Sequence, residues 1–520
     1  MDAAWGQNER KMKGAPVSAT LVCTALASGC AVGPDFHRPA PPGHAGYTTE
    51  PLPQTSSSAP VHGGAAQRLV LGGDVVFEWW REFHCSALDA LVEAAFKANP
   101  TVTAAQAALR QAHELVAAQR GYFFPAIDAT YQAERHKVSG NTENSETPGV
   151  QASGTNLLPH QDSSGSPVPA PVYYTFHTAE LTVSFVPDVL GGNRRQVESL
   201  AAQAEAQRFT LAATCITLAS NVVAAAVQEA SVRAQIEATQ KLIEADTRAL
   251  QILREQFRLG YAMRIDVAAQ EAALAQVQTT LPPLRKQLEQ TRDLLRALVG
   301  RLPNQEIERL ELEQLQLPEE LPVSLPGNII EQRPDVRAAE AQLHAANAQV
   351  GVAVAAMLPQ FSITGAYAGN ATTISQIFSS GGPFWNIFFD AAQPLFHGGT
   401  LLHQKRAADR ALRQAAAQYR AAVVTAYQNV ADTLHASIGD ADELAADVEA
   451  EEAAKVTFDL TRRQLEAGYT NYLTLLGAEA TYQQALLARV QAQATRFGDT
   501  VALFQALGGG WWNRKELAAR

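Results

Sequence analysis

The sequence has few aromatic residues, few charged residues and little cysteine. Aromatic residues make up 7% and charged residues 18% of the 520 residues, whereas hydrophobic residues as a whole make up 47%. Such a mixture favours long, closely packed helices over several bulky globular cores. Lys and Arg total 41 against 52 Asp and Glu, for a net charge of −11. No dense basic cluster occurs, so the sequence lacks the electrostatic signature of nucleic-acid binding.

The cysteines lie far apart and form no CxxC pair. They are Cys23, Cys30, Cys85 and Cys215. This spacing indicates neither a zinc site nor a disulfide framework. Cys85 and Cys215 are interpreted as small apolar packing residues, and a disulfide between them in the periplasm remains an open alternative.

Recognisable catalytic motifs are also missing. The sequence has no GxSxG, HExxH, P-loop or GxGxxG motif, and its 12 histidines are scattered without metal-ligand spacing. A lipid-anchored periplasmic enzyme would need a catalytic cluster that the sequence does not display. We therefore predict a protein that is not an enzyme and has no cofactor and no metal site.

The N-terminus has the pattern of an export signal. A short basic region at 10–13 precedes an apolar region at 15–27, and the residues Leu-Ala-Ser-Gly-Cys end at Cys30. Small residues before a cysteine in this position resemble the lipobox of bacterial lipoproteins. The resemblance implies that 1–29 is a signal peptide and that Cys30 becomes the acylated first residue, through a diacylglyceryl thioether and with palmitate-type acylation.

Beyond the signal, the chain lacks an obvious membrane-spanning helix. No run of about 20 consecutive apolar residues follows Ala27, so a segment that spans a membrane would have to be a strand. Residues 31–73 are rich in Pro, Gly, Ser and Ala, which predicts an extended, weakly structured arm over 30–76. Either Met1 or Met12 is compatible with translation start.

An internal repeat organises the rest of the chain. Three matched pairs are Asn99–Val102 with Arg333–Val336, Gly260-Tyr261 with Gly468-Tyr469, and Glu271-Ala272 with Glu479-Ala480. The spacing between the copies shortens in the middle, because the first copy has a longer loop rich in Ser, Thr, Gly and Pro at 139–171. We predict a first repeat at 77–310, a second repeat at 311–510 and a C-terminal tail at 511–520.

Each repeat shows two stretches of alternating apolar and polar residues, the period of strands with one apolar face. They predict strands at about 126–137 and 173–187 in the first repeat, and at about 360–374 and 384–394 in the second. Single-chain barrels need at least about eight strands, and open sheet edges are not tolerated in lipid. The chain is therefore expected to oligomerise, and three copies would give twelve strands around an aqueous interior.

Long heptad patterns follow the strands and predict a helical hairpin in each repeat. The predicted hairpins are 192–300, bent at Gly260, and 399–507, bent at Gly468. Pro282-Pro283 is expected to kink or interrupt the return helix of the first hairpin. The predicted fold class is mainly α with a membrane β-barrel portion, built from two repeats of helix, strand, strand and long helical hairpin.

Several motifs together resemble a known family. They are Val32–Pro39 behind the lipobox, Trp79-Trp80, Arg333–Val336 and Gly468–Leu476. Over about Cys30 to Gly508 the sequence is similar to the outer-membrane factors of tripartite efflux systems, in the lipoprotein branch typified by OprM and NodT, with TolC more distant. This implies a homotrimer with a twelve-stranded β-barrel in the outer membrane of a Gram-negative bacterium and a long α-helical barrel in the periplasm.

The resemblance also implies partners and a function. It predicts the exit duct of a tripartite efflux pump, of RND type or similar, with a role in multidrug resistance. The partners are a periplasmic adaptor (membrane fusion) protein, an inner-membrane transporter and outer-membrane lipid, without nucleic acid. The exported substrate and the class of pump are not encoded in readable form. The alternative is an envelope-spanning coiled-coil lipoprotein scaffold without a pore. The net negative charge favours the hypothesis of a cation-preferring lumen.

The hairpin tips are implied to close the periplasmic entrance and to contact the adaptor. The predicted residues are Gly260, Tyr261, Arg264, Asp266, Arg462, Arg463, Gly468, Tyr469, Asn471 and Tyr472. Charge pairs and tyrosine hydroxyls there are expected to form inter-chain hydrogen bonds, with a solvated turn and ordinary helix caps as the alternative. Relatives such as OprM have an aromatic residue where Leu465 stands and an acidic residue where Gly477 stands. The gate is therefore expected to be looser, or to depend on Asp266 and the tyrosines.

Overall fold

The computed structural model describes residues 31–40, 46–138, 160–161, 167–168 and 172–513. The predicted signal peptide 1–29, Cys30 and most of the tail 511–520 lie outside the described residues. The chain divides into two compact units, and the boundary between them falls within α3, α4, α7 and α8. The first unit is Met1–Phe36, Glu114–Ala201 and His344–Arg413, and the second is His37–His113, Ala202–Leu343 and Gln414–Arg520.

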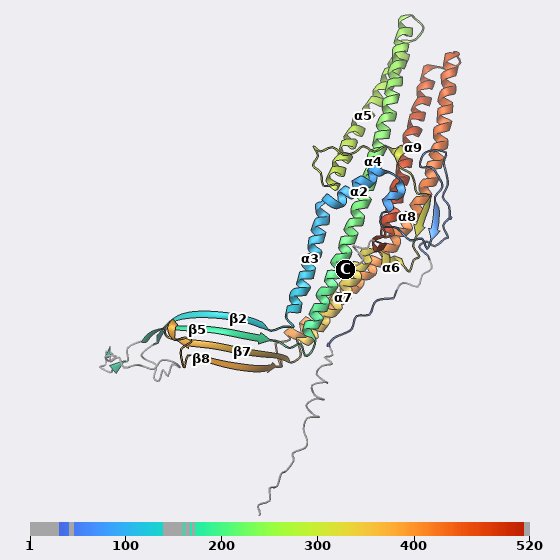
Figure 1. The fold of residues 1–520 in the computed structure, drawn as a ribbon. Helices are drawn as coiled ribbons and strands as arrows, with labels where there is room; N and C mark the ends of the chain where they lie inside the picture. Colours follow the sequence, from blue (N-terminus) through green and yellow to red (C-terminus); the bar gives the residue numbers. More distant parts are fainter. Residues whose placement is uncertain (1–30, 41–45, 139–159, 162–166, 169–171, 514–520) are drawn as a thin grey trace, which may run out of the picture. The chain divides into compact units, whose positions relative to one another are not determined.

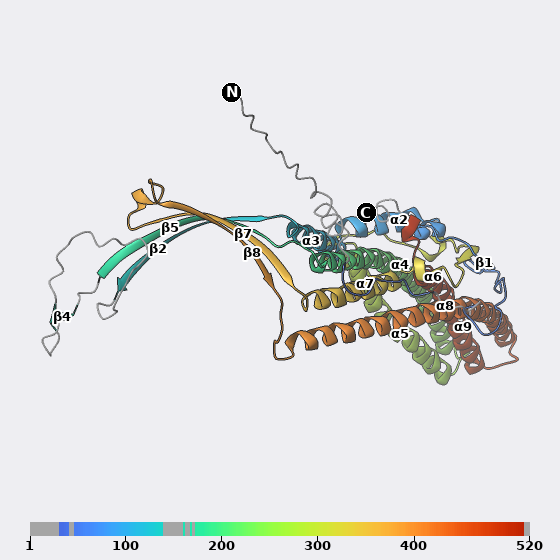
Figure 2. The ribbon, with the colours of Figure 1, turned by 90° about the horizontal axis from the view of Figure 1, so that it is seen from below.

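The first unit contains a four-stranded antiparallel sheet in the order β2-β5-β7-β8. The strands are β2 (Ala126–Val138), β5 (Val172–Phe185), β7 (Gln360–Ala371) and β8 (Pro383–Ala392). Figure 2 shows them as one strongly curved sheet. The middle pair, β5 and β7, joins the two hairpins of the sheet, with Leu181 opposite Tyr367. In the described chain β2 and β8 are the edge strands.

Two helical hairpins dominate the second unit. The first pairs α4 (Gly192–Arg258) with α5 (Arg264–Leu298), and the second pairs α8 (Thr400–Glu466) with α9 (Tyr472–Ala506). The outgoing helices each have 67 residues and the return helices each have 35. Figure 1 shows each pair joined by a short turn. The shorter helices α3 (Pro100–Gly121) and α7 (Pro334–Ala355) have 22 residues each.

The prolines of α5 do not interrupt the helix, so that part of the sequence expectation was wrong. Pro282 and Pro283 lie inside a continuous helix. A proline removes the hydrogen bond to the carbonyl four residues earlier, here those of Gln278 and Thr279. Both of these residues and both prolines are exposed. Water can therefore satisfy the freed carbonyls, and the helix continues.

One apolar stretch was overlooked at the sequence level. Within α4, an 18-residue window has a mean hydropathy of 1.8, which is apolar enough to cross a membrane. However, 67% of this window is buried inside the protein. Ile216 of α4 belongs to a core cluster with Phe209 and Trp511. The window is therefore explained by packing within the second unit.

The predicted arm is more structured than its composition suggests. Arg68–Leu71 form β1, which pairs in parallel with β6 (Glu320–Val323). Arg496, which is 1% exposed, donates hydrogen bonds to the backbone oxygens of Gly63 and Ala65 at 3.2 and 2.7 Å. The expectation of weak structure was wrong here, because backbone pairing and a buried guanidinium hold a segment that has little apolar content of its own.

The remaining elements are short. They are η1 (Trp79–Phe83), α2 (Ser86–Ala98), β3 (His160–Gln161), β4 (Pro167–Val168), η2 (Leu312–Gln314), α6 (Ile329–Gln332), η3 (Ile374–Gln376) and η4 (Trp511–Asn513). Trp79 in η1 stacks on Phe504 of α9 with ring centroids 5.2 Å apart. Cys85 and Cys215 are buried and are not joined in a disulfide, which removes that alternative and leaves the packing interpretation.

Candidate functional site

The two helical hairpins turn through the same backbone motif. After α4, the N–H groups of Gly260 and Tyr261 donate to the carbonyls of Phe257 and Gln256 at 3.0 and 2.8 Å. After α8, Gly468 and Tyr469 donate to Leu465 and Gln464 at 3.0 and 2.9 Å in the same pattern. This is the Schellman motif, which needs a left-handed residue. Gly260 and Gly468 supply it with φ of 82° and 78°.

At the first tip, Asp266 caps α5 and does not pair with Arg264. Its carboxylate accepts the N–H of Met263 at 3.1 Å, which satisfies a donor that a helix start leaves unpaired. Arg264 lies 3.7 Å from Glu271 instead, and Glu271 accepts a closer bond from Arg254 at 2.9 Å. Within the chain, Asp266 is thus used as a helix cap, while Tyr261 is 84% exposed.

At the second tip, Asn471 is the cap of α9. Its side-chain oxygen accepts the N–H of Thr474 at 2.9 Å. Arg462 lies 3.5 Å from Asp459, Arg463 is exposed, and Tyr469 is 86% exposed.

The two departures from the family pattern lie close to this second tip. Leu465 is half-buried in the last turn of α8, and Gly477 is exposed on α9. A Cβ at Gly477 would meet no atom within 4 Å. Packing within the described chain therefore does not require the glycine.

Tyr472 behaves differently from the other tip residues, because it reaches across to the first hairpin. Its hydroxyl donates to Oε1 of Gln270 on α5 at 2.8 Å. Gln270, which is 0% exposed, donates through Nε2 to Oδ1 and to the backbone oxygen of Asp246 on α4 at 3.2 and 3.3 Å. The sequence predicted an inter-chain role for Tyr472, whereas the structure gives it a partner within the same chain.

Glu479 of α9 completes this group, here called the inter-hairpin cluster (Asp246, Gln270, Tyr472 and Glu479). Burial and the neighbouring Asp246, with which it hydrogen-bonds, raise the pKa of Glu479 to about 8. Asp246 is 2% exposed, and its Oδ2 has no donor when both carboxyls are ionised. A proton on Glu479 supplies that donor. At neutral pH Glu479 therefore holds a proton.

The pKa of Tyr472 rises to about 12, first through burial and then through the negative charges of Glu479, Asp246 and Asp266. The tyrosine is thus fixed as a hydrogen-bond donor. The sequence analysis missed Asp246, Gln270 and Glu479. The match of Glu271 with Glu479 in the repeat pointed to the last of them, but sequence spacing does not reveal which copy lies beside a second carboxyl group.

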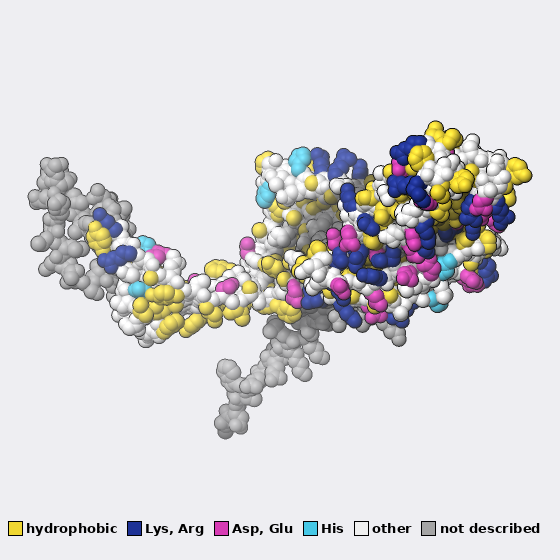
Figure 3. All heavy atoms as spheres, turned by 90° about the horizontal axis from the view of Figure 1, so that it is seen from above, with side chains coloured by type: hydrophobic (Ala, Val, Ile, Leu, Met, Phe, Trp, Pro, Cys, Tyr) yellow, Lys and Arg dark blue, Asp and Glu magenta, His cyan; other side chains and the backbone are white. Residues whose placement is uncertain are grey.

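The sheet of the first unit has two chemically different faces. On β2, the side chains of Ile127, Ala129 and Tyr131 alternate with Asp128, Thr130 and Gln132. The register places Leu181 and Val183 of β5 on the face of Ile127. Large apolar side chains on this face are exposed, with Ile127 at 67% and Tyr131 at 57%, and Figure 3 shows hydrophobic side chains along the sheet. Such a face requires an apolar environment or a partner.

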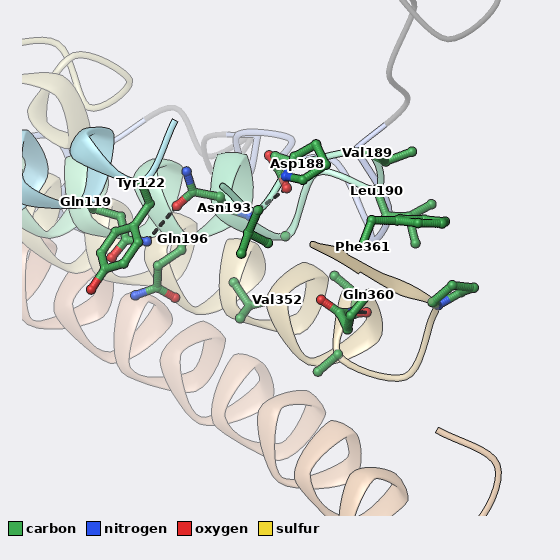
Figure 4. A pocket seen from close by; sticks show the side chains of 16 residues that line it. Gln119, Tyr122, Asp188, Val189, Leu190, Asn193, Gln196, Val352, Gln360 and Phe361 are labelled. Atoms are coloured by element: carbon green, nitrogen blue, oxygen red, sulfur yellow. Dashed lines mark hydrogen bonds between the residues drawn. The ribbon is translucent and has the colours of Figure 1, made fainter. Parts of the chain in front are cut away.

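A cavity of about 390 Å³ lies in the first unit where the strands meet α4. Figure 4 shows Gln119 donating to Asn193, at 2.6 Å, and Asp188 accepting the N–H of Asn193, at 2.9 Å. Asp188 also accepts the N–H of Arg194, so its carboxylate caps α4. The side chains of Gln119 and Asp188 are thus used by the fold itself, and the walls of the cavity are mainly apolar.

The segment behind the lipobox is held by a buried arginine of the same unit. Arg195 of α4 contacts the carboxylate of Asp35 at 2.7 Å and donates to the carbonyl of Val32 at 3.1 Å. Phe36 stacks on His344 with ring centroids 4.4 Å apart. A Cβ on Gly33 would lie 2.4 Å from the backbone of Gly351, so only glycine permits this close approach.

Comparison with known proteins identifies the family. The outer membrane efflux protein family matches residues 91–301 and 325–509. The chain belongs to this family. In the part of the chain that the structure describes, no group of three or more His, Cys, Asp or Glu side chains is arranged to hold a metal, and the family is one of transport proteins. As a member of the outer membrane efflux protein family, the chain acts in efflux at the outer membrane.

Curated relatives cover nearly the whole chain. The pyoverdine export outer membrane protein OpmQ of Pseudomonas aeruginosa is 28% identical over 85% of this chain and 89% of its own length. The probable efflux pump outer membrane protein TtgC of Pseudomonas putida is 26% identical over 95% of this chain and 96% of its own.

Solved structures show the same fold. The outer-membrane channel OprN has a TM-score of 0.78 and 25% identity over 93% of this chain and all of its own. The Campylobacter jejuni CmeC channel has a TM-score of 0.80 and 19% identity over 94% of this chain and 97% of its own. This TolC-like, mainly helical fold agrees with the coarse fold predicted from the sequence.

Proposed function

We propose that three copies of this chain form the exit duct of a tripartite efflux pump, with a twelve-stranded β-barrel in the outer membrane. The observation that carries the proposal is the open sheet β2-β5-β7-β8, which has an exposed apolar face. Unpaired strand edges cannot remain in lipid. Because neighbouring strands are all antiparallel, β2 and β8 run in opposite directions. The β8 of one copy can therefore pair in antiparallel fashion with the β2 of the next.

The same sheet supports an aqueous lumen. Its other face carries all the carboxylates of residues 126–138, 172–185, 360–371 and 383–392, namely Asp128, Glu134, Glu180 and Asp390. In a closed barrel this face would line the pore, and its charge would favour cations. A reversal potential in a KCl gradient is expected to show cation preference, and the Asp128→Asn, Asp390→Asn double variant is expected to reduce it. Anion preference in the parent protein would reject the charge assignment.

The hairpins are proposed to continue the duct into the periplasm, where a periplasmic adaptor and an inner-membrane transporter of RND type or similar would deliver substrates. The matching lengths of the two hairpins, 67 and 35 residues in each case, support two internal repeats that contribute equivalent helices. Relatives are named for the efflux of pyoverdine, toluene or antibiotics, all of them small molecules. We extend that class, without a specific compound, to this chain.

Cys30 is proposed as the lipid anchor. The support comes from the arm behind it, because Arg195 holds Val32 and Asp35 against α4. A clamp this close to the anchor would keep the acyl chains near the base of the sheet. Mass spectrometry of the purified N-terminal peptide tests this, and an unmodified thiol on Cys30 would contradict it.

The hairpin tips are proposed as the periplasmic gate, with contacts to the adaptor through the exposed Tyr261 and Tyr469. Closure is proposed to depend on the inter-hairpin cluster, which ties α9 to α4 and α5 within each protomer. Gly260, Arg264, Asp266, Gly468 and Asn471 build the turns and caps that present this cluster.

The decisive experiment for the duct measures stoichiometry and conductance on the same sample. Native mass spectrometry of the detergent-purified protein is expected to show a trimer, and planar bilayers are expected to show ion channels. A trimer without conductance would favour the alternative, a coiled-coil scaffold that spans the envelope without a pore. A stable monomer in lipid would overturn the proposal.

A further inference from the structure

The charges of the sheet are segregated by sign between its two faces. Residues 126–138, 172–185, 360–371 and 383–392 include only two basic side chains other than histidine, Arg135 and Lys137. Both belong to the odd-numbered positions of β2, the face that carries Ile127 and Tyr131. The four carboxylates of these strands lie on the opposite face. The charged side chains on the apolar face are therefore all basic.

The two basic residues lie together at one end of this face. Both are exposed, and they stand at the end of β2 that leads into the 139–171 connection. Figure 3 shows Lys and Arg side chains at the end of the sheet next to the residues drawn in grey. Arg135 follows Ile127 by eight residues, a rise of about 20 Å for a tilted strand. Both side chains are thus expected at the rim of an apolar band about 25 Å high.

The neighbouring side chains on β5 leave most of the donors of these residues available. The register sets Arg135 opposite Thr175 and Lys137 opposite Tyr173. One guanidinium nitrogen of Arg135 donates to the hydroxyl of Thr175 at 2.9 Å, and a guanidinium has five donors. The ammonium of Lys137 lies 5.6 Å from the ring centre of Tyr173. Thr175 and Tyr173 therefore orient the two cations without neutralising them.

Cations on a lipid-facing surface need an anion at the same depth. Lys and Arg next to a membrane surface are attracted to anionic headgroups, and a guanidinium pairs well with the planar oxygen pairs of phosphate. The connection at 139–171, between β2 and β5, is longer than the connection between β7 and β8. Long connections are usual on the outer side of such barrels. In the proposed barrel, the headgroups at this end would be those of the outer leaflet, where Gram-negative bacteria carry a phosphorylated glycolipid.

We propose that Arg135 and Lys137, oriented by Thr175 and Tyr173, form a binding site for the phosphate groups of the outer-leaflet glycolipid. The inference depends on the proposed barrel, because it requires the face of Ile127 to meet lipid. A trimer would carry three such sites around its outer rim, each next to the edge strand β2. The partner is the glycolipid phosphate and not the glycerophospholipids of the inner leaflet, which lie at the opposite end of the strands.

Lipid binding to the purified full-length protein tests the site. Native mass spectrometry follows the titration of the trimer with diphosphoryl lipid A, with dephosphorylated lipid A and with phosphatidylglycerol. The Arg135→Gln, Lys137→Gln double variant is expected to bind diphosphoryl lipid A about 30-fold more weakly, at about fivefold per charge. The matched control Arg285→Gln, Lys286→Gln changes the net charge equally at exposed positions of α5 and is expected to bind like the parent.

A charge-preserving variant separates the site from a folding defect. Arg135→Lys, Lys137→Arg is expected to restore most of the binding. Equal binding of diphosphoryl lipid A by the parent and the double Gln variant would overturn the inference, as would equal binding of phosphatidylglycerol by the parent. Conductance recorded on the same preparations distinguishes failure of the lipid site from failure of the proposed duct. Channels without lipid A binding refute only the lipid site, whereas protein that forms no trimer and no channel refutes the duct.

Discussion

Glu271 and Glu479 occupy the same position in the two hairpins but have opposite environments. Each is the eighth residue of a 35-residue return helix, α5 or α9. Arg254, through a hydrogen bond, and Arg264 lower the pKa of Glu271. Burial and Asp246 raise the pKa of Glu479 to about 8. The repeat preserves the carboxyl group, while the neighbouring residues decide whether it is ionised beside two arginines or protonated beside Asp246.

The difference extends to the surrounding positions. Ala454 of α8 stands where α4 has Asp246, and Ala478 of α9 stands where α5 has Gln270. The first hairpin therefore supplies the buried acceptors, and the second supplies Tyr472 and the protonated carboxyl. Two hairpins of equal length and equal turns are thus specialised as the two sides of one polar contact.

The largest expected effect is a dependence of gating on pH that belongs to Glu479 alone. Closed hairpins hold its proton up to about pH 8, whereas a separated, hydrated Glu479 titrates near its ordinary value of 4.5. Closure is thus fully supported below about 4.5, weakens as pH rises, and loses this contribution above about 8. Single-channel recordings are expected to show an open probability that rises by up to about tenfold per pH unit within that window.

Matched variants sharpen this prediction. Glu479→Gln and Asp246→Asn are each expected to flatten the pH dependence. The first removes the titrating carboxyl group, and the second removes the charge and the hydrogen bond that help to raise its pKa. Glu271→Gln, the repeat counterpart, should leave it intact. Asp440→Asn is a second control, because burial and a hydrogen bond with Asp499 raise the pKa of Asp440 to about 7, yet this pair joins α8 and α9 of one hairpin. An unchanged pH profile in Glu479→Gln would refute the assignment.

Tyr472→Phe is expected to have the next largest effect. Without the hydroxyl, Oε1 of Gln270 loses its donor at a position that is 0% exposed. An unsatisfied buried acceptor costs about 1–3 kcal/mol, so the open probability should rise roughly 5- to 150-fold. Tyr469→Phe is the control, since this ring is 86% exposed and the change should be near zero. Equal effects of the two substitutions would show that the hydroxyl of Tyr472, like that of Tyr469, makes no stabilising contact.

Replacement of the turn glycines is expected to affect both hairpins equally. Gly260 and Gly468 have positive φ, and a Cβ at either would meet no atom within 4 Å. The cost to alanine is therefore backbone strain alone, about 1–2 kcal/mol. Hydrogen exchange of the last turns of α4 and α8 should accelerate roughly 5- to 30-fold in Gly260→Ala and Gly468→Ala respectively. A strongly unequal response would mean that one turn receives support from outside the chain.

Sequence patterns predicted the repeated elements of this molecule better than its site. The alternation at Ile127–Gln132 predicted a strand and its faces, because a period of two follows directly from strand geometry. Glycine at 260 and 468 marked both turns. The partner of Tyr472 was missed because it depends on how α9 packs on α5 in three dimensions. The continuity of α5 through Pro282 was missed because it depends on solvent exposure of the freed carbonyls.

The smallest expected effect compares the two helix caps. Asn471 accepts the N–H of Thr474 at the start of α9, whereas Asp266 accepts the N–H of Met263 at the start of α5. Asn471→Ala should cost about 1 kcal/mol and speed hydrogen exchange in the first turn of α9 about fivefold. Asp266→Ala removes the cap of α5 and also a negative charge near Tyr472. We expect the lost cap to destabilise the start of α5 and the lost charge to favour closure slightly, so that the net change is small. Asn471→Asp and Asp266→Asn, which keep the acceptors, should preserve exchange rates, and faster exchange in either would show that the caps are not the stabilising contacts.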